Sequence, residues 1–271
     1  MIEALSLPFM QHAVWAAVLA AVCCGVVGTL IVANRMVFLA GGAAHAAYGG
    51  VGLASFLALP MLPVTVAFTV AAALAMAAIT LRHVEDTDTV IGVLWAAGMA
   101  CGIILLDLSP GYKPDLMSYL FGSIITVPVA DLLALAGLAV VLVAVTLRYY
   151  HGFVAMAFDR EFAAVRGAPV TFLHYLLTAL SAVAVVLLIR VAGLILIIAL
   201  ISVAPSLAMR RAGSLGRAMV GATVLNLFFC LSGLAVAYRF DLTSGAAIIA
   251  VAATVFFLSL CPACFRKRER T

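Results

Sequence analysis

The chain has 271 residues, of which 67% are hydrophobic and only 10% charged, and its mean hydropathy is +1.28. This composition excludes an ordinary soluble protein and predicts an all-α, polytopic membrane protein with a single transmembrane domain over residues 1–271. The net charge of +4 comes from Arg and Lys at the ends of apolar runs, so it bears on membrane topology, and we expect no nucleic-acid partner.

Apolar runs separated by charged or turn-forming residues predict about nine membrane spans. They cover residues 11–33, 43–59, 63–81, 88–107, 129–148, 171–189, 191–209, 218–237 and 244–262. No Lys or Arg precedes the first run, so it lacks the basic region of a cleaved signal peptide and is expected to stay in the mature protein. With the N-terminus outside, only Lys113, Arg190 and Arg239 of the 15 basic residues are external and 12 are cytoplasmic, which favours an external N-terminus and a cytoplasmic C-terminus.

The second run places His45 at membrane depth among small residues. On a helix, Gly41, His45, Gly49 and Gly52 share one face. Each glycine weakens a helix by about 1 kcal/mol, so close approach of neighbouring helices must offset that loss. A histidine in a span is either a neutral imidazole bonded to a carbonyl of the next helix or a functional group beside a water-filled path. These residues alone leave both interpretations open.

A turn-rich segment follows the fourth run and is predicted to lie outside the membrane. Asp115 suits the N-cap of a short helix over residues 115–122, which would end at Gly122. Its Tyr119 fits a helix at the external interface, and an ordinary aromatic connection between spans is the alternative.

The longest polar interval, about residues 149–170, is predicted to be cytoplasmic. A short amphipathic helix is expected within it, with Asp159 and Glu161 at its beginning and Gly167 as its C-cap. Its apolar stripe consists of Phe158, Phe162 and Val165. Such a helix lies either on lipid headgroups or in a groove of a partner protein, and its mixture of acidic and basic residues favours the protein partner.

The sequence lacks the short motifs that are typical of nucleotide-binding and catalytic sites. It contains no GxxxxGK[ST] phosphate loop, no HExxH and no GxSxG, so we expect neither an enzyme nor a bound cofactor. The Cys261 and Cys264 pair has CxxC spacing but no second CxxC or histidine pair, which favours small hydrophobic residues over a metal or redox site. A transport path remains as the functional class.

Six sequence blocks follow one another between about residues 10 and 260. They are Arg35-Met36, His45-Ala46, DTVIG from Asp88, DLMSYLFG from Asp115, the apolar run from Val191 to Pro205, and DLTSG from Asp241. In this order they resemble the permease subunit of bacterial zinc/manganese ABC transporters, and DLMSYLFG is the most specific block.

The resemblance implies a type II importer-like permease in the bacterial inner (plasma) membrane. It implies a homodimer with the pore on its two-fold axis, a separate cytoplasmic ATPase that binds the ATP, and an external metal-binding protein that delivers Zn²⁺ or Mn²⁺. The amphipathic helix from Asp159 to Gly167 becomes the segment that docks in the ATPase. Asp115, Tyr119 and Asp241 become candidates for an external gate or docking site, with turn and cap roles as the alternative.

One position departs from the family's pattern. Many members carry an acidic residue four positions before the histidine, and this chain has Gly41. His45 is then expected to bind the metal with the His45 of a second copy, and the glycines on its face would let the two copies approach. Two neutral nitrogen ligands favour Zn²⁺ over Mn²⁺. The alternatives are an importer permease for a metal chelate of the siderophore or cobalamin type, an ion-coupled secondary transporter, and a purely structural membrane subunit.

Overall fold

The computed structural model describes residues 8–82, 87–110, 120, 122, 124 and 127–260. Within these ranges it is entirely helical, which confirms the predicted class. The helices are α1 (Pro8–Ala33), α2 (Val37–Phe56), α3 (Met61–Arg82), α4 (Thr87–Leu108), α6 (Val129–Phe158), α7 (Arg160–Val165), α8 (Val170–Ala192), α9 (Leu194–Met209), α10 (Leu215–Phe240) and α11 (Ser244–Leu260).

Each predicted span coincides with one long helix. Seven of these helices have the length and hydropathy needed to cross a membrane, and the apolar helices α9 and α11 are shorter, with 16 and 17 residues. The helix α2 begins six residues before the predicted position of 43. Only a tight turn separates it from α1, with Arg35 in the left-handed region at φ 58°.

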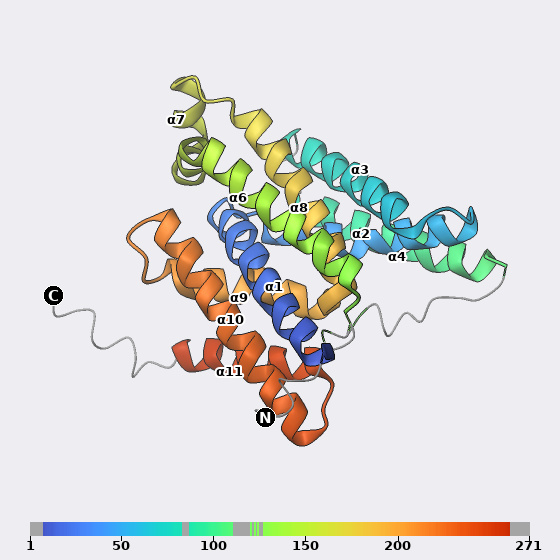
Figure 1. Cartoon of the computed structure of the whole chain (residues 1–271). Helices are drawn as coiled ribbons and strands as arrows, with labels where there is room; N and C mark the ends of the chain where they lie inside the picture. The colour runs from blue at the N-terminus through green and yellow to red at the C-terminus, as the bar shows by residue number, and fades with distance from the viewer. Residues whose placement is uncertain are drawn as a thin grey trace.

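The helices form two groups around a central set (Figure 1). On one side, α2 packs against α3 and α4, and on the other α9, α10 and α11 pack against one another. Between them, α1 contacts α6, α9 and α10, whereas α8 contacts α2, α3 and α6. The helix α8 therefore connects the first group with the centre of the bundle.

The helix α6 extends ten residues beyond the predicted end of the fifth span, to Phe158. Its backbone bends at Tyr149, where φ is −113° and ψ is 16°. The extension is helical because it buries Phe153 and Met156 against the bundle, and it carries no charge that would favour a loop. Phe158, which was predicted to belong to the short amphipathic helix, is therefore the last residue of α6.

The predicted short amphipathic helix is confirmed as α7, which projects from one end of the bundle (Figure 1). The Asp159 side chain caps it, because its Oδ1 accepts a hydrogen bond of 2.9 Å from the Phe162 N–H. Gly167 follows the helix with φ 82°, a left-handed conformation that glycine adopts without strain. The sequence predicted both ends of α7 correctly because each is set by a capping residue next to the helix, Asp159 at the beginning and Gly167 after the end.

Candidate metal path and coupling surface

His45 lies near the middle of α2 and is half-buried. Its Nδ1 lies 2.8 Å from the carbonyl oxygen of Gly41, one turn earlier in the same helix. A carbonyl only accepts hydrogen bonds, so Nδ1 carries the proton and Nε2 keeps a free lone pair. Histidines that bind metals commonly have one ring nitrogen held by a backbone carbonyl in this way, which leaves the other nitrogen to donate its lone pair to the metal.

Trp95 of α4 covers one side of this imidazole. The two ring centroids are 4.0 Å apart, with an angle of 33° between the planes. The indole is held in turn by its N–H, which donates to the Met99 sulfur at 3.1 Å, and by an edge contact with Phe38, whose ring centroid is 6.3 Å away. We had not identified Trp95 from the sequence. Its rarity was the available signal, since the chain has only two tryptophans.

Two glycines leave the surface beside this pair open. A Cβ atom placed on Gly41 or on Gly92 would find no neighbouring atom within 4 Å. Gly41 precedes His45 by one turn of α2, and Gly92 precedes Trp95 by about one turn of α4. The imidazole therefore borders a region of the surface that the described part of the chain does not fill.

Gly49 and Gly52 have a different role from the one expected. A Cβ at Gly49 would lie 2.5 Å from the Phe68 ring of α3, and a Cβ at Gly52 would overlap the backbone of Gly102 in α4. These glycines serve close packing within one chain, and they are not open to a second copy. The expectation that they bring two subunits together was wrong, because α3 and α4 pack against them, whereas a Cβ at Gly41 meets nothing within 4 Å.

The structure brings no further ligand to His45 from within the described residues. In those ranges, no group of three or more His, Cys, Asp and Glu side chains could hold a metal ion. Asp115 and Tyr119 lie outside the described residues. Asp241 is the C-cap of α10, with φ 53° and ψ 46°, so its observed role is to end a helix.

The exposed apolar surface of the α7 region matches the predicted stripe. Phe158, Phe162 and Val165 are 88%, 56% and 87% exposed. The guanidinium carbon of Arg166 lies 4.9 Å from the centroid of the Phe162 ring, a cation–π contact that holds the ring in place. Three large apolar side chains at one end of the bundle form a ridge that a partner could cover. We call these three residues the apolar ridge.

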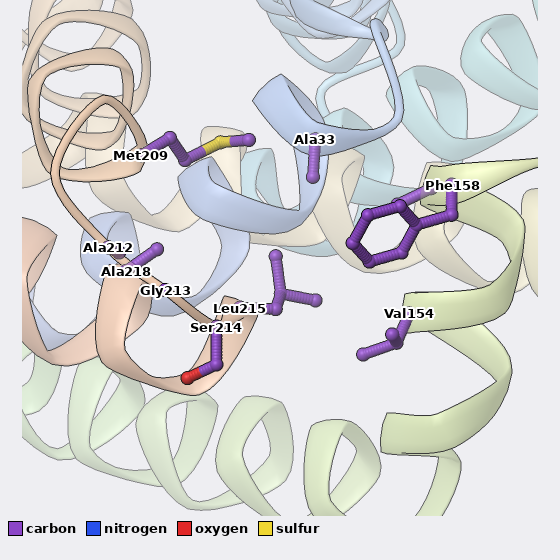
Figure 2. Close-up of a pocket in the computed structure, with 10 residues that line it drawn as sticks. Ala33, Val154, Phe158, Met209, Ala212, Gly213, Ser214, Leu215 and Ala218 are labelled. Carbon is purple, nitrogen blue, oxygen red and sulfur yellow. The ribbon is translucent and has the colours of Figure 1, made fainter.

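A cavity of about 240 Å³ opens beside the ridge (Figure 2). Figure 2 shows Phe158 and Val154 of α6 on one side and Leu215 at the beginning of α10 facing them. Its lining consists of Ala33, Val154, Ala157, Phe158, Met209, Ala212, Gly213, Ser214, Leu215 and Ala218. The ends of α1, α6 and α9 and the beginning of α10 therefore meet at the same end of the bundle as α7.

A bundle of membrane-length helices, an imidazole on an open face and an apolar ridge at one end together define a membrane permease. The comparisons with known proteins agree. The ABC 3 transport family matches residues 6–263, and the chain belongs to this family.

Similar proteins match over nearly their whole length. The membrane protein slr2045 of Synechocystis is 44% identical over 260 residues, which cover 96% of this chain and 92% of that protein. The manganese transport system membrane protein MntC of Halalkalibacterium halodurans is 28% identical over 257 residues, covering 95% of this chain and 88% of MntC.

Two solved structures share the fold. PsaBC from Streptococcus pneumoniae, in complex with a Fab, matches with a TM-score of 0.85 and 28% identity over 95% of this chain and 93% of that one. A metal-chelate type ABC transporter in an inward-facing conformation matches with a TM-score of 0.70 over 93% of this chain and 85% of that one. Its 18% identity shows a common fold only.

Proposed function

We propose that the chain is the permease subunit of an ABC importer for a divalent metal ion, with Mn²⁺ as the cargo. The observation that carries this proposal is His45, a histidine at membrane depth whose Nδ1 contacts the Gly41 carbonyl and whose ring lies beside the open surface at Gly41. Similarity to MntC of H. halodurans supports manganese. An ion in transit needs a few weak ligands rather than a closed site, and one imidazole per chain fits that need.

The expected preference for zinc finds no support. It rested on the two neutral imidazole nitrogens that a pair of His45 residues would supply. The space beside Gly41 admits water and carbonyl oxygens, which are the ligands that Mn²⁺ prefers. The similarity to a manganese permease therefore outweighs the argument from nitrogen ligands.

A second copy of the chain would complete the site. One copy supplies a single imidazole, and the described residues hold no other cluster of metal ligands. The open surface at Gly41 and Gly92 adjoins His45 and Trp95, so a homodimer that closes on this surface would bring two imidazoles to its axis. The pore would then lie between the copies.

The proposed orientation puts α7 in the cytoplasm, the N-terminus outside and the C-terminus inside the cell. Basic residues support it, because most of those in the described loops adjoin the α7 end of the bundle. They are Arg35, Arg160, Arg166, Arg210, Arg211 and Arg217. The opposite end carries Arg190, paired at 3.1 Å with Asp131, and Arg239.

A separate ATPase would dock on the apolar ridge and supply the energy. The sequence has no phosphate-binding loop of its own, and α7 exposes apolar side chains where a soluble partner can reach them. Metal would arrive from an external binding protein. Asp241 lies at the end of the bundle that this protein would face, and Asp115 and Tyr119 are assigned to the same role from the sequence.

Uptake of radioactive Mn²⁺ into liposomes tests the proposal. The tagged chain is expressed in its native cells, purified through the tag, and reconstituted. We expect an ATPase to copurify and ATP to drive uptake of the free ion. Absence of a copurifying ATPase would reject the importer class, and uptake of a metal chelate without uptake of the free ion would favour the siderophore or cobalamin type.

A further inference from the structure

A single polar contact joins α7 to α8. Arg160 Nη2 lies 2.7 Å from His174 Nδ1, and Arg160 is the first residue of α7 whereas His174 lies in the first turns of α8. A guanidinium only donates hydrogen bonds, so Nδ1 accepts and His174 is neutral with its proton on Nε2. This is a charge-assisted hydrogen bond, which is stronger than one between neutral groups.

The burial of His174 indicates more than a packing role. The side chain is only 4% exposed, and its Nε2 has no hydrogen-bond partner in the described part of the chain. A buried N–H without a partner is unfavourable, and a leucine would fill the space without that penalty. Since the Arg160 bond is the only hydrogen bond that the ring makes there, it is the interaction that a histidine provides at this position and a leucine cannot.

The other attachments of α7 are its packing against α6 and the turn that leads into α8. Ala163 is buried, and its carbonyl accepts a hydrogen bond of 3.0 Å from the Ala168 N–H. The chain then turns at Gly167, whose φ of 82° makes it the conformationally least restricted residue of the connection. The bond between Arg160 and His174 therefore joins α8 to the end of α7 that is farthest from this turn.

The helix α8 continues from His174 to the helix that carries His45. Thr178 and Ser181, on the same side of α8, donate hydrogen bonds back into the helix at 2.9 and 2.8 Å. One residue further on, Ala182 packs with Ala43 of α2 and Ala73 of α3 in a cluster whose three members are fully buried. Ala43 precedes His45 by two residues, so α8 contacts α7 at one end and the metal-path helix near its middle.

We propose that His174 is a positioning residue that locks α7 to α8, so that displacement of α7 by the ATPase passes through α8 to α2 and His45. The inference rests on the proposed function, because the ATPase supplies the displacement. Contiguous packing alone does not demonstrate coupling, so the test measures coupling directly.

The test compares Mn²⁺ uptake with ATP hydrolysis in the same liposomes, using the complex of the full chain and its ATPase. His174→Leu removes the acceptor, and His174→Asn keeps one because the Asn Oδ1 occupies the place of Nδ1. The matched control is His151→Leu, which changes an exposed histidine in the α6 extension. We expect Mn²⁺ imported per ATP hydrolysed to fall about tenfold in His174→Leu, the scale of a lost hydrogen bond to a charged group. The ratio should stay near that of the unmodified chain in His174→Asn and His151→Leu.

A second variant covers the case in which His174→Leu does not fold. Arg160→Met changes an exposed residue and removes the donor, and we expect the same fall in the ratio. In the double variant the fall should not exceed that of either single change, because both remove one interaction. If the unmodified complex neither hydrolyses ATP nor imports Mn²⁺, the proposed function fails. If that complex works and Arg160→Met or His174→Leu keeps its ratio, the positioning role is wrong.

Discussion

The imidazole of His45 lies against the indole of Trp95, with 4.0 Å between the ring centroids. Together with the bond from Nδ1 to the Gly41 carbonyl, this contact restrains the ring at two points. A ligand whose orientation is fixed before the metal arrives loses less entropy on binding. Trp95 thereby supports the single imidazole in a chain that lacks the acidic residue expected one turn earlier.

The fluorescence of Trp95 should report metal at His45. In a Trp15→Phe background Trp95 is the only tryptophan, and Trp15 is an exposed residue whose replacement should leave the fold intact. We expect Mn²⁺ to quench Trp95 emission in the purified permease, since the ion would bind next to the indole. Adding His45→Ala should abolish the effect, and quenching that survives this change would show that the ion binds elsewhere.

His45→Ala should lower Mn²⁺ uptake by about tenfold or more, as expected when a ligand worth ~1.4 kcal/mol is removed from the path. Stability should change little, because the Gly41 carbonyl that His45 contacts is also an acceptor of the α2 helix and does not become unpaired. The measurement is uptake normalised to folded dimer, alongside thermal unfolding. Unchanged normalised uptake would reject His45 as a ligand.

Gly41→Ala and Gly52→Ala should have opposite effects on stability. The Cβ of Gly41→Ala enters open space and improves helix propensity, so we expect a gain of about 0.5–1 kcal/mol. The Cβ of Gly52→Ala overlaps the Gly102 backbone, and we expect a loss of about 1–3 kcal/mol. Denaturation of the two variants in the same detergent measures the difference, and a loss for both would contradict the open surface at Gly41.

Gly41→Asp should strengthen Mn²⁺ transport. The substitution puts a carboxylate one turn before His45, in space that holds no other atom of the described chain within 4 Å of the new Cβ. Carboxylate oxygens suit Mn²⁺ better than imidazole does, so we expect the apparent KM for Mn²⁺ to fall severalfold. Gly41→Asn has nearly the same shape without the charge and serves as the control. An equal effect in both variants would assign the change to packing.

Phe162→Asp should uncouple the ATPase while the permease still folds. Phe162 is 56% exposed, so the change removes apolar docking surface without opening the core. Phe162→Leu, which keeps an apolar side chain, should retain most of the activity. The measurement is metal-stimulated ATP hydrolysis of the copurified complex. Normal hydrolysis and transport in Phe162→Asp would show that the partner docks elsewhere.

Much of the fold could be predicted from apolar runs and helix-capping residues. Each of the nine apolar runs became a helix because lipid-facing segments must satisfy their backbone hydrogen bonds internally. Asp159 and Gly167 delimit α7 through cap geometry that depends only on neighbouring residues. The α6 extension was missed because Phe153 and Met156 are stabilised by contacts with distant segments, which spacing along the chain does not reveal.

The candidate site was less predictable for a related reason. Periodicity placed Gly41, Gly49 and Gly52 on the face of His45, but it could not show that α4 covers only two of these glycines. The contact between His45 and Trp95 joins residues 50 positions apart, and it depends on how α2 and α4 pack. Such contacts depend on how the helices pack, and the spacing of residues along the sequence does not reveal them.

The bend at Tyr149 gives the α6 extension the geometry of a rigid arm. From Tyr149 to Phe158 the helix rises about 14 Å, at 1.5 Å per residue. A tilt of about 10° at the bend displaces Phe158 by roughly 2 Å. With the proposed ATPase on the apolar ridge, a small rotation of that partner would displace Phe158 by about this distance through the bend at Tyr149.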